Sequence, residues 1–247
     1  MALKPILNYS PNFNSKKRTY KQIKFIIFHY TGMKSESNAL KRLTDIQSEV
    51  SCHYLIKNNG EIIKLVPDLY IAWHAGRSSW QNYKFLNQNS IGIEITNPGH
   101  EHGYKKFTQK QISSLLKLSK FLIKRYKINS KNILGHSDIA AERKKDPGEK
   151  FPWEYLSKNK IGIWHTLNKQ DLIKNRKLKI NKIEENFFFR NLFKIGYSKE
   201  YSKDKDKNKY LRELTKTFQR RFRQELIDGK IDQECLIISK NLTKANN

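Results

Sequence analysis

The sequence predicts an α/β fold, with a central mixed β-sheet flanked by helices and a small all-α domain after it. Residues 23–30 form an almost continuous apolar run, as in a central strand that is covered on both faces. Asn59-Gly60 stands between two apolar segments and is a strong signal for a two-residue β-hairpin. From Thr108 onward, apolar residues recur at helical spacing, which indicates a long amphipathic helix.

Length and composition limit the number of domains and argue against one class of function. The 247 residues suffice for one large domain or for a main domain and a small one. The net charge of +26 invites a nucleic-acid interpretation, because clustered Lys and Arg bind phosphates. Lysine is instead spread over every segment, so we expect no specific nucleic-acid function and only a general affinity for polyanionic surfaces.

Cysteines and apolar runs bear on the compartment. Cys52 and Cys235 are far apart and lack the spacing of a zinc knuckle or a disulfide scaffold, so both are expected to be small buried residues. No run approaches the roughly eighteen apolar residues of a membrane span, so we predict no transmembrane segment. The N-terminus has no apolar core of signal-peptide length, but an upstream signal removed earlier would leave the same picture.

The N-terminal half is predicted to build the sheet. Residues 1–22 are polar and contain two prolines, which indicates an arm. The strand 23–30 carries His29 near its C-terminal end, the edge at which α/β proteins usually build sites. A short amphipathic helix follows, marked by Leu40, Leu43 and Ile46 or Gln47.

Two more strands and an aromatic connection come next. Residues 52–57 and 61–66 are predicted to be the two strands of the hairpin. Residues 67–88 form a long connection that carries Trp73, His74 and Trp80, and it is therefore too aromatic for a simple linker. Loops of this kind usually line a site.

Residues 91–95 alternate strictly and read as a strand. Ile91, Ile93 and Ile95 face one side, while Gly92 and Glu94 face the other. A carboxylate beside a residue without a side chain suggests room for a ligand above the strand. The alternative is an ordinary solvated strand face.

The long helix begins at a recognisable cap and leads to a second short strand. Thr108 and Gln111 fit a capping box. The apolar face of this helix comprises Ile112, Leu115, Leu116, Ser119, Leu122, Ile123 and Tyr126. Residues 132–134 are then predicted to form a strand that ends just before His136.

After Trp164 the composition becomes rich in lysine and polar residues. Three segments with their own apolar faces, 183–193, 211–226 and 231–242, predict helices, with Asp228-Gly229 ending the second. The charge run 202–209 is expected to be a solvated loop. We therefore predict three parts, namely an arm (1–22), a catalytic domain (23–164) and a helical domain (165–247).

The stretch 135–148 concentrates chemistry-bearing side chains. It contains His136, Lys144 and Asp146 within about a dozen residues, the parts from which a hydrolytic zinc centre is built. Pro147 favours an extended conformation at Asp146, which would hold that carboxylate at a defined angle. A polar loop between a strand and a helix is the alternative interpretation.

The combination of these segments resembles a known family. In order along the chain, residues 23–164 carry Phe28-His29-Tyr30-Thr31, Ser51-Cys52-His53-Tyr54-Leu55, Leu65-Val66-Pro67, Ala72-Trp73-His74-Ala75-Gly76, Asn89-Ser90-Ile91-Gly92-Ile93-Glu94, Gly135-His136-Ser137-Asp138-Ile139-Ala140 and Arg143-Lys144-Lys145-Asp146-Pro147-Gly148. This set resembles the zinc-dependent N-acetylmuramoyl-L-alanine amidases of the AmpD/AmiD type, within the amidase and peptidoglycan-recognition superfamily.

The resemblance implies one Zn²⁺ per chain and a role for each matching residue. His29, His136 and Asp146 are the implied metal ligands, which leaves a fourth position for water. Glu94 resembles the general base, and Lys144 resembles the cation that stabilises the developing oxyanion. The implied partner is peptidoglycan or its muropeptides, 1,6-anhydro forms included, cut between the lactyl group of N-acetylmuramic acid and L-alanine during wall turnover. A non-catalytic wall-recognition module is the alternative.

Four further residues are predicted to contact substrate, namely His53, Trp73, His74 and Asn97. His53 fits a buried core histidine equally well. Two neighbouring residues are alternatives to the implied ones. Asp138 could be the metal ligand in place of Asp146, and Lys145 could be the stabilising cation in place of Lys144. Residues 100–103 (His-Glu-His-Gly) are either a second metal site or simply exposed loop histidines. Cys52, near the implied site, is either a small buried residue or a reactive thiol.

The C-terminal segment is similar to the peptidoglycan-binding domain of AmiD-type enzymes. Residues 218–223 and 228–232 match its pattern of a helix, a turn and a second helix. A wall-binding domain favours a bacterial protein of the cell envelope, the periplasm or the exterior over a cytoplasmic one. A helical appendage packed on the catalytic domain is the alternative.

Overall fold

A mixed six-stranded sheet forms the centre of the molecule in the computed structural model, which describes residues 4–201 and 206–244. Its strand order is β1-β5-β4-β9-β3-β10. The strands are β1 (Ile6–Leu7), β5 (Ile62–Lys64), β4 (Tyr54–Ile56), β9 (Ser90–Ile95), β3 (Phe25–Tyr30) and β10 (Ile133–Gly135). β4 and β5 pair antiparallel as the predicted hairpin, and the other neighbours pair parallel. The predicted fold class is confirmed.

One face of the sheet is covered by α2 (Gln109–Tyr126). This helix begins at the predicted capping box, in which the Thr108 side chain accepts from the backbone of Gln111. Its buried side chains pack against the three isoleucines of β9, as the alternation predicts. Leu118, which the predicted apolar face omitted, is fully buried as well. Two short helices, α3 (His136–Ile139) and α4 (Trp153–Lys158), follow β10.

The other face has two covers. Near β4 and β5 it packs against α1 (Glu36–Thr44), through a small cluster around Leu43 and Leu55. Near β3 and β10 it joins a larger cluster that includes Phe25, Ile27 and Leu134 from the sheet. The hairpin of β7 (Ser79–Trp80) and β8 (Tyr83–Lys84) contributes Trp80 to that cluster.

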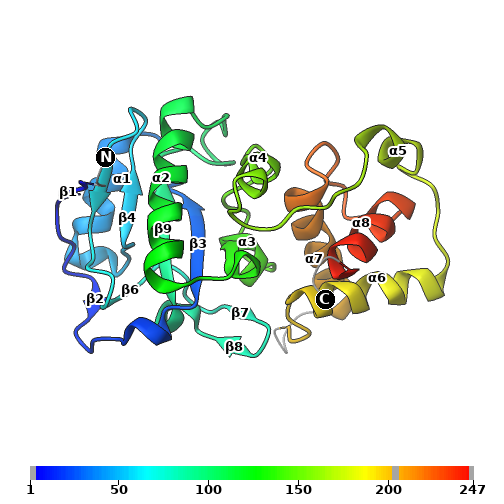
Figure 1. Cartoon of the computed structure of the whole chain (residues 1–247), viewed down its shortest axis with the longest axis horizontal. Helices are drawn as coiled ribbons and strands as arrows, with labels where there is room; N and C mark the ends of the chain where they lie inside the picture. Colours follow the sequence, from blue (N-terminus) through cyan, green and yellow to red (C-terminus); the bar gives the residue numbers. More distant parts are fainter. Residues whose placement is uncertain (1–3, 202–205, 245–247) are drawn as a thin grey trace.

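The C-terminal helices belong to the same larger cluster. They are α5 (Lys169–Lys174), α6 (Lys182–Ile195), α7 (Lys207–Phe222) and α8 (Gln233–Lys244). Phe188, Leu192 and Phe218 from these helices are buried in one continuous core with Phe25 and Ile27 of β3. Figure 1 shows the sheet at one end of the long axis and these helices at the other, with α3 and α4 between them.

Two local expectations, for the N-terminal arm and for Ile46, differ from the structure. The arm adds β1 to the sheet edge, and its β2 (Phe13–Asn14) pairs with β6 (Ile71–Ala72), so these residues pack as part of the fold. Ile46 lies beyond the end of α1 in a 3₁₀ turn, and its side chain is 63% exposed. Because Asp45 caps that turn by accepting from the backbone of Gln47, the helix ends before Ile46.

The boundaries of α7 also differ from the expectation. The helix starts inside the charge run, because Asp206 accepts from the backbones of Asn208 and Lys209 and so caps it. Residues 202–205 of that run lie outside the described part of the chain. The helix ends at Phe222, ahead of the predicted stop at Asp228-Gly229, since Arg223 leaves the helical conformation and its guanidinium binds Asp228 at 3.0 Å.

Across residues 4–201 and 206–244, no helix combines the length and the apolar character needed to cross a bilayer.

Candidate active site and metal centre

Strand register brings the two candidate ligand histidines, His29 and His136, together. His29 is the fifth residue of β3, and Gly135 of β10 pairs with Phe28 of β3. His136, the first residue of α3, therefore follows at the level of His29, just after the end of the neighbouring parallel strand. The third candidate ligand, Asp146, is held by backbone contacts, since the Ser137 N–H donates to the Asp146 carbonyl at 2.9 Å.

Gly135 is required by the close approach of these two segments. A Cβ at this position would lie 2.6 Å from Cδ of Pro147, so any larger residue would push the two ligand-bearing segments apart. The Asp146–Pro147 peptide bond is cis.

Three donor atoms converge in a triangle. Nδ1 of His29, Nδ1 of His136 and Oδ2 of Asp146 lie 3.0 Å from one another. Two imidazole nitrogens and one carboxylate oxygen this close together are a donor set that would hold one zinc ion. All three residues are buried, and within the described residues they are the one group of three such side chains close enough to share an ion.

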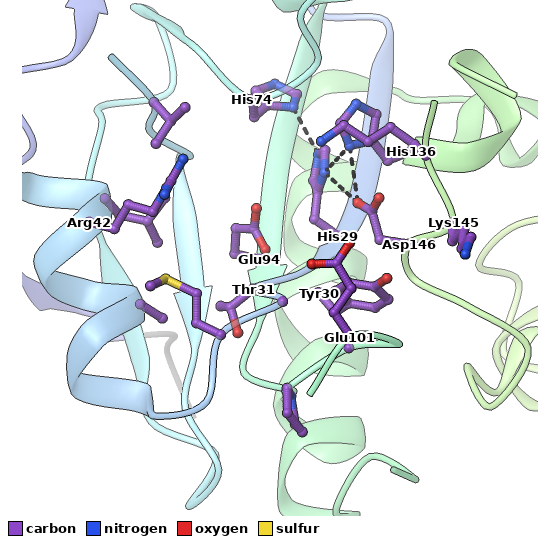
Figure 2. Close-up of a pocket in the computed structure, with 18 of the residues that line it drawn as sticks. His29, Tyr30, Thr31, Arg42, His74, Glu94, Glu101, His136, Lys145 and Asp146 are labelled. Atoms are coloured by element: carbon purple, nitrogen blue, oxygen red, sulfur yellow. Dashed lines mark hydrogen bonds and ion pairs between the residues drawn. The ribbon is translucent and has the colours of Figure 1, made fainter. Parts of the chain in front are cut away.

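Hydrogen bonds to the outer ring nitrogens orient both imidazoles, and Figure 2 shows the one between His29 and His74. Nε2 of His136 lies 3.1 Å from the carbonyl oxygen of Ala75, which accepts and never donates. This nitrogen therefore carries the ring proton, and the lone pair of Nδ1 points into the triangle.

The orientation of His29 depends on a longer chain of contacts. The Ser90 hydroxyl donates to the Leu86 carbonyl at 2.6 Å and therefore accepts from Nε2 of His74 at 3.2 Å. Nδ1 of His74 is then the acceptor for Nε2 of His29 at 3.0 Å. Nδ1 of His29 is left unprotonated and directed at the triangle, so this relay prepares the second ligand.

The electrostatics produce the protonation states that a metal ion requires. Burial and the neighbouring His136 lower the pKa of His29 to about 4, so its ring is neutral at physiological pH. Burial alone would raise the pKa of Asp146, but its contacts with His136 and His29 hold it well below its usual range. Neutral imidazoles and an ionised carboxylate are the forms that bind zinc.

Glu94 lies beside this triangle on the same face of the sheet. It pairs with His29 across β9 and β3, which places both side chains on the face opposite the isoleucines. Burial, together with the charge of Asp146, raises the pKa of Glu94 to about 8. Among the residues that the structure describes, its buried Oε2 has no hydrogen-bond partner, so this oxygen has an open bonding position.

The two adjacent lysines are not equivalent. Lys144 lines the pocket, and its charge lowers the pKa of both His29 and Glu94. Lys145 also lines the pocket but lies apart from the three donor atoms in Figure 2. This difference favours Lys144 as the cation of the site.

A pocket of about 470 Å³ opens over these groups. Besides the three donors, Glu94 and Lys144, its lining includes Met33, Arg42, Trp73, His100 and Glu101. Trp73 stands at its rim with 37% of its surface exposed. The room for a ligand predicted above this strand lies over Glu94, which lines the pocket. The space at Gly92 itself is filled, because a Cβ there would lie 2.4 Å from the ring of His74. Gly92 therefore makes room for the relay that supports His29.

Two of the predicted substrate contacts lie away from the pocket. His53 is fully buried, with Nδ1 accepting from the Gly92 backbone and Nε2 bonded to the Tyr70 carbonyl. Asn97 is 1% exposed, and its side chain bonds the backbone of Lys105 and Gly99. Both side chains hold loops and strands in place.

The remaining alternatives also find definite positions. Oδ2 of Asp138 accepts from the Gly135 backbone at 2.7 Å, directed away from the triangle. His100 pairs with Glu149 at 3.0 Å, and His102 is exposed, so residues 100–103 do not converge on a common point. Cys52 is fully buried, and burial raises the pKa of its thiol.

Sequence reasoning missed the Ser90 end of the relay and the role of Arg143. The guanidinium of Arg143 donates to the Ala75 carbonyl, the same oxygen that orients His136, and to Arg77. Both supports act through backbone or through another side chain, so residue type and spacing alone give no signal for them.

Comparisons with known proteins agree with this geometry. A family model described as N-acetylmuramoyl-L-alanine amidase matches residues 19–149, more than half of the chain. AmiD of Escherichia coli is 34% identical over 235 residues, covering 90% of this chain and 83% of the relative. AmpD of Haemophilus influenzae is 34% identical over 167 residues, covering 60% of this chain and 88% of the relative.

Solved structures give the same result. AmiD from E. coli, solved as a complex with a muropeptide substrate, superposes with a TM-score of 0.78 at 33% identity, over 94% of this chain and 93% of that one. AmpDh3 from Pseudomonas aeruginosa superposes with a TM-score of 0.77 at 31% identity, over 94% and 96%. The resemblance inferred from the motifs is confirmed, and this chain belongs to the N-acetylmuramoyl-L-alanine amidase family.

Proposed function

We propose that this protein is a zinc-dependent amidase that cleaves the bond between the lactyl group of N-acetylmuramic acid and L-alanine of the peptidoglycan stem peptide. The observation that carries the proposal is the convergence of His29, His136 and Asp146 in a pocket that also contains Glu94. The relatives support the substrate class: AmiD was solved with anhydro-N-acetylmuramic acid-L-Ala-D-γ-Glu-L-Lys, and AmpDh3 with an anhydromuramic pentapeptide.

The donor set suits one zinc ion per chain. Two neutral imidazole nitrogens and one carboxylate oxygen converge from one side, so the opposite side stays open to the pocket. Bound there, zinc would supply Lewis acidity, which polarises the scissile carbonyl and lowers the pKa of water. His74 and Ala75 keep the two imidazoles turned toward the ion through their outer nitrogens.

Glu94 is the proposed general base and acid. Its carboxylate takes a proton from the attacking water and delivers it to the nitrogen of the departing L-alanine. The raised pKa and the unpartnered Oε2 support this role, because they keep the group able to hold a proton and leave it an open bonding position. Without such a role, a buried and unpartnered carboxylate would be a net cost to the fold.

Lys144 is the proposed electrostatic stabiliser. It lines the pocket from the loop that leads to Asp146, and its charge acts on His29, so it suits the stabilisation of the negative charge that develops on the carbonyl oxygen. Trp73 at the rim supplies a flat apolar surface for the substrate, whereas His74 acts on His29 from behind. The burial and bonds of His53 and Asn97 favour structural roles for these two residues.

Metal content and product identity test the proposal together. Purified protein should hold about one zinc per chain. Mass spectrometry of products from intact sacculi and from anhydro-muropeptides should show free stem peptide, which disappears with a chelator and returns with zinc. His136→Ala should lose both metal and activity, because it removes one of three donors. Binding of muropeptides without release of peptide would instead identify a wall-recognition module.

The C-terminal helices support a location at the cell envelope. The similarity to AmiD covers 90% of this chain and therefore extends into these helices, while the similarity to AmpD covers 60%. A net charge of +26 also favours contact with the anionic wall. Fractionation of the source bacterium tests this part of the proposal, and recovery of the protein in the cytoplasmic fraction alone would contradict it.

A further inference from the structure

A buried ionic contact joins the C-terminal helices to the segment that carries His136. Asp138 lies in α3, two residues after this ligand, and is 3% exposed. Its carboxylate forms an ion pair with Arg221 of α7, which is also 3% exposed. Its other oxygen accepts from the hydroxyl of Tyr197, just after α6, at 2.9 Å. Two residues of the helical part therefore bind one carboxylate of the catalytic part.

This carboxylate fixes the turn that presents His136. Oδ2 of Asp138 accepts from the backbone N–H of Gly135, the residue immediately before the ligand. The guanidinium of Arg221 also donates to the carbonyl of Ile133, at the start of β10, at 3.1 Å. Arg221 thus binds the strand before His136 directly, and the turn after it through Asp138.

The two helical residues are themselves held firmly. The guanidinium of Arg221 lies 4.1 Å from the ring centre of Trp153, a cation–π contact in the core. The ring of Tyr197 packs edge-on against Trp80 at 4.9 Å. Gly196 allows this approach, because a Cβ there would lie 2.5 Å from the Trp80 ring. In the described residues, Arg221 is the one ion-pair partner of Asp138, so the counter-charge for this carboxylate comes from α7.

We propose that Arg221 and Tyr197 are positioning residues of the metal centre, which hold His136 in its ligating position by clamping Asp138. The inference rests on the proposed metal function. It means that the helical part completes the metal centre, whatever its own affinity for the wall. Polar groups behind metal ligands commonly change metal affinity by about 10–100-fold when they are removed.

Tyr197→Phe is the cleanest test, because it removes one hydroxyl and keeps the buried ring. Its matched control is Tyr210→Phe, another buried tyrosine, whose hydroxyl donates to the Ser198 carbonyl at 2.6 Å and does not reach Asp138. Zinc affinity is measured on the full chain by competition with a chromogenic chelator. We expect about 10-fold weaker binding in Tyr197→Phe and wild-type binding in Tyr210→Phe.

Arg221→Lys provides the second arm. Lysine keeps the charge but does not bind Asp138 and Ile133 together. Its control is Arg223→Lys, two residues along, where an equally buried guanidinium pairs with Asp228 and Asp232 inside the helical part. Both substitutions lower thermal stability, so stability alone does not discriminate between them. Only Arg221→Lys should weaken zinc binding, by about 10–100-fold, and alter the visible absorption spectrum of the Co²⁺-substituted protein.

The outcomes separate the two proposals. If wild-type protein binds no zinc, or if His136→Ala binds zinc as tightly as wild-type protein does, the proposed metal function itself fails. If wild-type protein binds zinc but Tyr197→Phe and folded Arg221→Lys bind it equally tightly, with unchanged Co²⁺ spectra, the positioning role is overturned. Should Arg221→Lys fail to fold, the pair of tyrosine variants still decides the question.

Discussion

The catalytic part (residues 23–164) and the helical part (165–244) use buried polar residues in different ways. In the catalytic part, strand register positions the polar side chains, because His29 pairs with Glu94 across two parallel strands. In the helical part, Arg223 is neutralised within its own helices, but Arg221 is neutralised by Asp138 of the other part. The candidate metal ligands come from one region, while the support proposed for them, Arg221, comes from the other.

The same contrast holds for packing. The isoleucine face of the sheet has its own cover in α2, as in a self-contained α/β unit. The opposite face shares a continuous core with the C-terminal helices, including Phe25 of β3 and Phe218 of α7. Removal of the helices would expose this face to water, which is costly for large apolar side chains. The two regions are therefore expected to depend on each other for stability.

Glu94→Gln should produce the largest effect, a loss of turnover. It separates the role of Glu94 in hydrolysis from any role in holding the metal site together. Loss of a general base lowers turnover by about 10²–10⁴-fold, and zinc content should stay at the wild-type level because no donor atom is removed. Amide hydrolysis and bound zinc are measured side by side. The control is Glu61→Gln on the exposed hairpin, which should leave both unchanged. Near-normal turnover of Glu94→Gln would remove this carboxylate from the mechanism.

Phe218→Ala tests the shared core. This ring is fully buried and packs edge-on against Phe188 at 5.1 Å, so its loss should lower the free energy of unfolding by about 3–5 kcal/mol. Because the core is continuous, near-UV and far-UV circular dichroism should report one transition for the whole chain. Phe187→Ala, at an exposed position on α6, is the control. Separate melting of the helices ahead of the sheet would favour two independent domains.

Lys144→Met sharpens the choice between the adjacent lysines. If Lys144 stabilises the developing oxyanion, its loss should reduce kcat by about 10²–10³-fold with little change in bound zinc. Lys145→Met removes the same charge one residue later and should change kcat much less. Equal losses in the two variants would indicate that general positive potential in the pocket matters more than one placed ammonium.

Asp68→Asn should give the smallest effect, visible in acid. Burial acts to raise the pKa of Asp68, but hydrogen bonds from Lys64, Tyr54 and Tyr126 lower it on balance. A lowered folded-state pKa contributes stability above the unfolded pKa of about 3.9 and loses it as pH falls toward the folded value. Urea unfolding from pH 6 to pH 2.5 should show this decline in wild type and a shallower one in the variant. Parallel curves would rule out Asp68 as a source of acid sensitivity.

Much of the fold follows from local sequence. The isoleucine alternation in β9, the Asn-Gly hairpin and the Thr108 cap each depend on neighbours within a few residues, so spacing alone predicts them. The implied metal ligands were likewise named from motifs, since His29 follows a strand and His136 and Asp146 share one short segment. The metal and catalytic roles themselves stay predictions until the experiments above are done.

Other features were decided only by the tertiary structure. The alternation in β9 indicated room for a ligand above Glu94, but not that Gly92 gives space to His74, which lies in a loop about twenty residues earlier. Asp138 looked like a rival metal ligand, but Arg221 binds it from 83 residues away. Local sequence specifies backbone conformation and the pattern of burial. Which buried polar group meets which partner depends on long-range packing, because a charge in a low-dielectric core is stable only where a distant segment supplies its counterpart.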